Sequence, residues 1–146
     1  MKKHLIIIVL CLLSTLQIWA EIKLPALFTD NMMLQQNMEA PIWGWGNKNE
    51  MLQVFTSWDS KTYDVKVDKY GKWKTKLATP KAGGTYQITI KQGTEAKTIS
   101  NVLIGEVWLC SGQSNMEMPL KGFTGQPVKG GNEAIIHSAN NNIRFI

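Results

Sequence analysis

Arginine and histidine are scarce in this chain of 146 residues, and the scarcity excludes some functions. Nearly all basic residues are lysine, and Arg144 is the single arginine. Nucleic-acid recognition relies on arginine forks and clustered basic patches, so we expect no nucleic-acid partner. The densest basic stretch, residues 69–76, alternates as the solvent face of a strand does, which we favour over a polyanion site.

Long hydrophobic runs are also lacking. The longest, residues 5–13, has nine residues and falls short of the roughly 20 needed to span a bilayer. It follows a basic start, MKKH, and precedes a more polar stretch that ends at Ala20. This layout predicts a signal peptide over residues 1–20 and an exported protein, periplasmic or extracellular, with no stable membrane span after cleavage.

Cysteine is the third shortage, since Cys11 and Cys110 are the only two. Cleavage after Ala20 would leave Cys110 alone, so no internal disulfide can form. The processed chain would keep 14 basic against 11 acidic residues, a net charge of +3. With 44% hydrophobic and 18% charged residues, the composition is that of a globular protein.

Short two-periodic runs fill residues 21–104 and predict an all-β module. Alternation over five to seven residues, with turn residues between the runs, indicates antiparallel strands with one buried face. The runs cover residues 41–45, 52–58, 63–67, 72–77 and 85–90. Five such strands in about 80 residues predict a small β-sandwich or a barrel-like module.

Four tryptophans fall within these strands, at Trp43, Trp45, Trp58 and Trp73. Aromatic faces stack on sugar rings, so a sugar-binding platform is one interpretation. Packing in the sheet or core is the interpretation that their alternating positions favour.

The pattern changes at Gly105. Residues 106–110 are apolar without alternation, as in a strand buried on both faces of a parallel sheet. A glycine-rich loop follows, then a short helix over residues 132–141 with Asn132 as its cap, then a second strand from residue 142. Strand, loop, helix and strand predict the start of an α/β domain over residues 105–146.

Ser114 lies in GQSNM, just beyond the predicted strand, where open α/β sheets place ligand sites. Gly112 permits a sharp turn there, and the following N–H groups can face an oxyanion. Met116 stands where the nucleophile elbow of α/β-hydrolases has its second glycine. On spacing alone, Ser114 is either a nucleophile or a structural serine.

The stretch GEVWLCSGQSNMEMPL, residues 105–120, resembles the first block of the sialate O-acetylesterase family of SGNH-type hydrolases. LPALFTDNMMLQQ and APIWGWG resemble the N-terminal β-module of the same family. The resemblance implies a flavodoxin-like catalytic domain, Ser114 as nucleophile and an acetyl-serine intermediate. It implies no metal or organic cofactor, and its substrate would be an O-acetylated sugar, sialic acid first.

The family's general base is a histidine three residues after an aspartate, and this chain does not match that pattern. His137 follows Ala134 at that spacing, and Asp68 is the last aspartate. We expect His137 to lie on a short helix without a catalytic role. The resemblance therefore predicts an incomplete N-terminal portion, inactive by itself, whose residues after about 105 are poorly ordered.

Other interpretations stay open. The substrate could be acetylxylan or another acetylated glycan, or the chain could be a non-catalytic carbohydrate-binding module with a vestigial hydrolase stub. Asn115 either orients the loop or touches substrate. We expect Cys110 to be buried, and Glu106 and Glu117 not to form a carboxylate pair.

Overall fold

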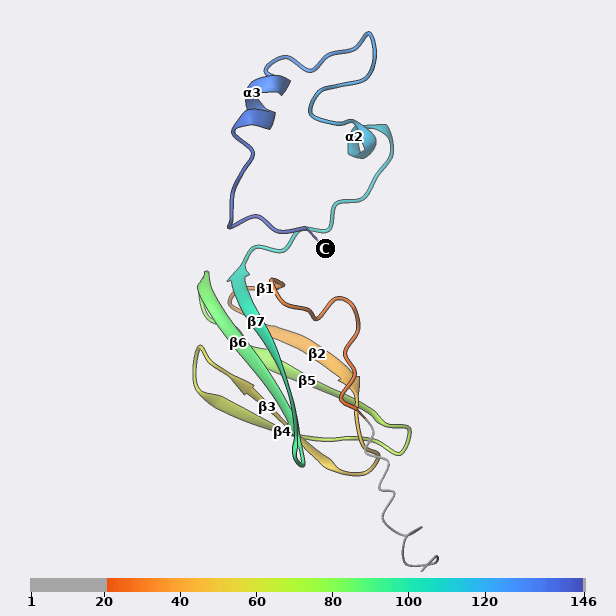
Figure 1. Cartoon of the computed structure of the whole chain (residues 1–146), viewed down its shortest axis with the longest axis vertical. Helices are drawn as coiled ribbons and strands as arrows, with labels where there is room; N and C mark the ends of the chain where they lie inside the picture. Colours follow the sequence, from red (N-terminus) through yellow and green to blue (C-terminus); the bar gives the residue numbers. More distant parts are fainter. Residues whose placement is uncertain (1–20, 146) are drawn as a thin grey trace, which may run out of the picture.

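The computed structural model describes residues 21–145, so the predicted signal peptide lies outside the described residues. Within them the chain forms seven strands and two short helices (Figure 1). The strands are β1 (Met33–Gln35), β2 (Glu39–Trp45), β3 (Met51–Thr56), β4 (Lys61–Lys66), β5 (Lys72–Ala78), β6 (Gly83–Gln92) and β7 (Glu95–Gly105). The helices are α2 (Ser114–Glu117) and α3 (Gly131–Ile136).

The strands form two sheets, and the predicted all-β module is confirmed. One sheet has the order β1-β7-β6-β3-β4, and the other pairs β2 with β5. Only the β1–β7 pair is parallel; the other pairs are antiparallel. Side chains from both sheets join one hydrophobic cluster, so the module is a sandwich with its core between the sheets.

Alternation along the strands builds this core. In β3, Leu52, Val54 and Thr56 are buried, and the residues between them face solvent. Strand β2 alternates in the same way, and its buried residues are Ala40, Ile42 and Gly44. Each fully buried aliphatic side chain contributes about 1.5–3 kcal/mol. Each of the five predicted alternating runs overlaps one of the strands β2 to β6, although the run 52–58 ends in the turn that follows β3.

Strand β7 has no counterpart in the sequence-based prediction. Its buried side chains are Ile99, Val102 and Ile104; the first two lie three positions apart, where an unbroken strand would bury every second residue. Asn101 between them has φ 56°, and the β6–β7 register shifts beside it. This irregularity hides the two-residue period, because it inserts one residue into the ladder.

The strand predicted at residues 106–110 does not form, and that prediction is wrong. Strand β7 ends at Gly105, and the next residues are irregular. Val107, Trp108 and Leu109 are 50%, 80% and 95% exposed. A strand buried on both faces needs neighbouring strands and covering helices, and none of the described residues supplies them here.

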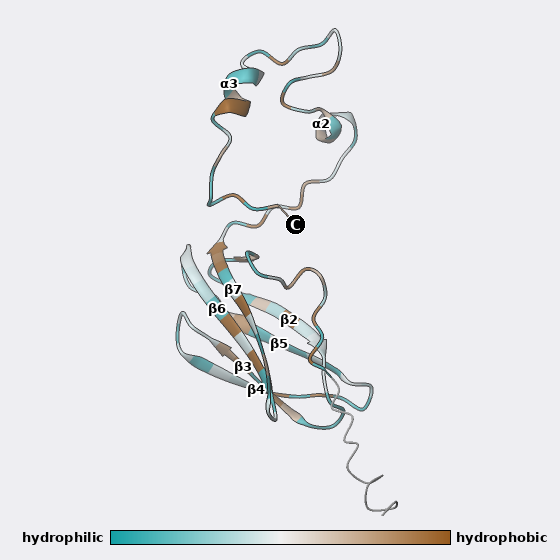
Figure 2. Cartoon of the chain, viewed as in Figure 1, coloured by the Kyte–Doolittle hydropathy of each residue, from teal (hydrophilic) through white to brown (hydrophobic). Residues whose placement is uncertain are grey.

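Residues 106–145 form an open loop beyond the sandwich, with α2 and α3 on opposite arms (Figure 1). The predicted strand from residue 142 is also absent from the described residues. The predicted helix shortens to α3, which follows Gly130 in a left-handed conformation in place of an Asn132 cap. Brown, hydrophobic residues mark β6, β7 and the end of α3 alike (Figure 2). No described helix has the length and apolar character that a membrane span requires.

Candidate functional site

Ser114 is the first residue of α2, directly after an extended turn. Its N–H therefore has no acceptor within the helix, while its carbonyl accepts the N–H of Met118 at 3.0 Å. A Cβ at Gly112 would lie 2.9 Å from Cγ of Met116, so a larger residue there would require that flexible side chain to move. The turn formed by GQSNM leaves Ser114 exposed to solvent.

The Ser114 side chain is exposed, and it makes no hydrogen bond to any described residue. His137 lies at the C-terminal end of α3, where its own N–H donates to the Glu133 carbonyl at 3.0 Å. The structure thus places the two residues on separate arms of the open loop (Figure 1). No hydrogen bond joins His137 to Ser114, and no described side chain is placed to act as a base for that serine.

Two other sequence-based interpretations of this segment have different outcomes. Cys110 is exposed, so the prediction that it is buried is wrong: the strand that would bury it has not formed. Glu106 and Glu117 form no pair within the described chain, as expected. The side chain of Asn115 lies outside the described part. No group of three His, Cys, Asp or Glu residues in the described chain is placed to hold a metal ion.

Glu106 has partners that the sequence did not predict. The side-chain amide of Gln35 donates to its Oε2 at 3.0 Å, and that of Gln36 donates to its Oε1 at 2.6 Å. The Gln35 side chain also accepts the N–H of Val107 at 2.7 Å. These bonds favour the ionised carboxylate, so they lower the pKa of Glu106 despite a small opposing desolvation effect.

We call Gln35, Gln36 and Glu106 the glutamine clamp. It fixes the direction in which the chain leaves β7 toward Ser114. The only sequence signal for it was the QQ pair inside a stretch that resembles the family, without any hint of its partner 70 residues later. Backbone bonding reinforces the clamp, since the Gln36 N–H donates to the Gly105 carbonyl at 2.8 Å.

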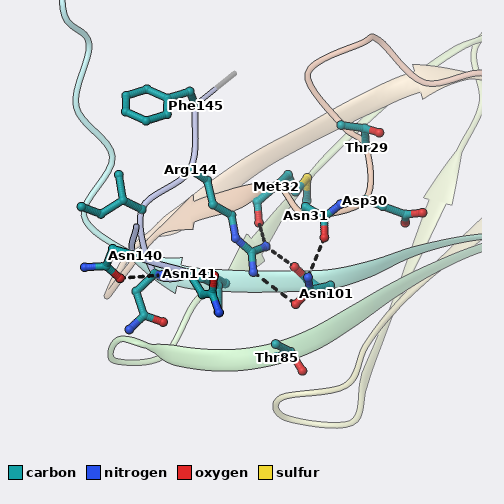
Figure 3. A pocket seen from close by; sticks show the side chains of 13 residues that line it. Thr29, Asp30, Asn31, Met32, Thr85, Asn101, Asn140, Asn141, Arg144 and Phe145 are labelled. Atoms are coloured by element: carbon teal, nitrogen blue, oxygen red, sulfur yellow. Dashed lines mark hydrogen bonds between the residues drawn. The ribbon is translucent and has the colours of Figure 1, made fainter. Parts of the chain in front are cut away.

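A second attachment lies where the end of the described chain returns to the sandwich (Figure 3). The Arg144 guanidinium donates to the Asn101 carbonyl and, at 3.1 Å, to the Asn101 side-chain oxygen. Asn101 in turn donates to the Asn31 side chain. A hollow of about 810 Å³ surrounds these groups, bordered also by Thr29 and Thr85. The single arginine of the chain therefore ties the far end of the loop to β7.

Comparison with known proteins gives one group of relatives. The chain is 34% identical over 103 residues to the sialate O-acetylesterase of Rattus norvegicus, covering 64% of this chain and 19% of the relative. It is 31% identical over 126 residues to the human sialate O-acetylesterase, covering 76% of this chain and 24% of the relative. No family model matches the sequence.

One solved structure is also similar to this chain in sequence and fold. The chain matches the crystal structure of a carbohydrate acetylesterase from Xanthomonas citri with a TM-score of 0.63 and 38% identity, covering 68% of this chain and 23% of that one. The chain thus spans about a fifth to a quarter of the length of the proteins it matches. From the agreement of sequence and structure we conclude that it belongs to the sialate O-acetylesterase family.

Proposed function

We propose that this chain is part of an exported serine esterase that removes O-acetyl groups from carbohydrates, with sialic acid as the first candidate substrate. The proposal is supported by the names of four relatives, all sialate O-acetylesterases of mammals at 31–36% identity. The Xanthomonas citri neighbour, named for carbohydrates in general, keeps acetylxylan and other acetylated glycans as rivals.

The residue that carries the proposed chemistry is Ser114. Its hydroxyl would attack the acetyl carbonyl, the sugar hydroxyl would leave, and water would release acetate from the acetyl-serine. An exposed hydroxyl and an N–H without an intrahelical acceptor are compatible with attack and with binding an oxyanion. We assign no cofactor to this reaction.

Activation of the serine needs a base, and the described residues bring none to it. A serine hydroxyl is a weak nucleophile at neutral pH, so we expect the 146-residue chain to release no acetate by itself. The sandwich and the glutamine clamp would then hold the motif in place for groups supplied by other residues.

A chimera tests the proposal. Residues 21–146 would replace the matching part of the Xanthomonas citri enzyme, which is 38% identical over the matched region. Acetate release would be measured with O-acetylated sialic acid and with acetylated xylan. We expect release from one of them, falling by at least about 10³-fold in Ser114→Ala.

Ser111→Ala is the matched control, because this serine lies in the same loop and has no proposed part in the reaction. It should keep most of the activity. Equal rates for Ser114→Ala and Ser111→Ala would remove Ser114 from the mechanism. Circular dichroism on each variant would separate loss of chemistry from loss of folding.

A further inference from the structure

The outward face of the β2–β5 sheet combines aromatic and cationic side chains in register. Trp45 pairs directly with Lys72, and Trp43 pairs with Lys74. Directly paired residues of an antiparallel ladder project from the same face, as do residues two apart on one strand. Two indoles on β2 therefore face two ammonium groups on β5.

These residues border a hollow of about 550 Å³, which is separate from Ser114 and from the Arg144 attachment. Lys66 and Asp68 complete its charged lining. Three lysines thus face one carboxylate, and an Asp68 oxygen already accepts the N–H groups of Tyr70 and Lys72. None of the three lysines forms an ion pair within the described chain, so the lining keeps a net positive charge that Asp68 offsets only in part.

The two tryptophans of β2 differ in packing and in exposure to solvent. Trp43 is held in place by Phe28, whose ring centroid lies 4.6 Å away in an edge-on arrangement. Trp45 is 41% exposed, so packing alone does not explain it. The preference for packing is confirmed for Trp73, which lies in the core, and for Trp43 and Trp58, which pack against it; Trp45 is not part of that cluster.

Trp73 also borders this hollow, but it is 3% exposed and belongs to the core. Alternation along β5 points its side chain to the face opposite Lys72 and Lys74. Its indole N–H, which has no acceptor among the described residues, therefore lies on the core side and does not support the binding site.

We propose that this hollow is a second sugar site, which binds a carboxylate-bearing sugar without cleaving it. The Trp45 indole stacks on the ring, and the Lys72 and Lys74 ammonium groups pair with the carboxylate. The requirement for a negative charge follows from the lysines alone. The choice of a sugar rests on the proposed function and on the single arginine, which disfavours a nucleic acid.

The test uses a ligand that has no ester to cleave. The purified chain would be titrated with N-acetylneuraminic acid, and in parallel with its methyl ester, which lacks the charge, while amide and indole signals are followed by NMR. We expect the acid to shift the Trp45 and Lys72 signals and the ester to bind at least about tenfold more weakly.

Trp45→Ala should abolish the shifts, and the double variant Lys72→Gln with Lys74→Gln should weaken binding by about tenfold. The controls are Phe55→Ala and Lys91→Gln, an exposed aromatic and an exposed lysine on the outer face of the five-stranded sheet. Both should leave binding unchanged. The dispersion of the remaining signals would show that each variant is folded.

Three results would overturn the proposal: no shift at this face with the acid, equal affinity for acid and ester, or tighter binding of a single-stranded oligonucleotide. Failure here would leave the esterase proposal intact, because the probe carries no acetyl ester. Conversely, an inactive chimera would leave this site standing.

Discussion

The sandwich and the segment that follows it hold the same kinds of residue in opposite environments. Every buried hydrophobic residue in the described chain lies between Ile22 and Ile104. From Val107 to Phe145, the large hydrophobic residues are exposed, including Phe145 at 94%. Whether a hydrophobic side chain is buried therefore depends on the packing partners around it. In the sandwich, the two sheets provide these partners for each other. In the segment with Ser114, the described residues provide none.

The two regions are joined at two points. The glutamine clamp holds the start of the segment, and Arg144 holds its end to β7. Between these points, the segment has two helices of four and six residues, too short to be stable alone. Among the described residues, these attachments hold the segment that carries GQSNM at its two ends.

The largest contrast should come from truncating one aliphatic residue in each region. Leu52→Ala removes a fully buried side chain from the core and should lower the free energy of unfolding by about 2–5 kcal/mol. Ile136→Ala, at a site 73% exposed, should change it by less than about 0.5 kcal/mol. Urea denaturation followed by tryptophan fluorescence measures both. A similar loss in the two variants would mean that the segment is packed.

A smaller effect should come from the clamp. The pKa of Glu106 is lowered in the folded chain, so the clamp contributes stability above the ordinary value of 4.5 and loses it as the pH falls through the lower, folded value. Since Glu106 is exposed, the change in overall stability will be slight. NMR of the Gln35 and Gln36 side-chain amides should show both signals moving together below pH 4.5.

Glu106→Gln is the matched variant, since it keeps the shape and removes the charge. Its glutamine amide signals should show no titration in that range. Continued titration of Gln35 and Gln36 in this variant would assign the effect to another carboxylate.

The sequence predicted those strands whose side chains alternate regularly between the core and the solvent. Alternation located β2 to β6, and resemblance located the family, whereas the role of Ser114 stays a prediction. Prediction from the sequence failed at β7, where the irregularity at Asn101 breaks the period, and at residues 106–110, where an apolar run alone cannot supply the other strands of a sheet. The clamp was missed because its partners are 70 and 71 residues apart.

Hydrogen exchange with mass spectrometry on the whole chain would test the central contrast most directly. We expect slow exchange for β2, β3, β5, β6 and β7, and exchange within seconds for peptides from residues 106–139, on both sides of Ser114. Strong protection of residues 106–120 would contradict this expectation, because that segment would then be packed by contacts that this structure does not contain.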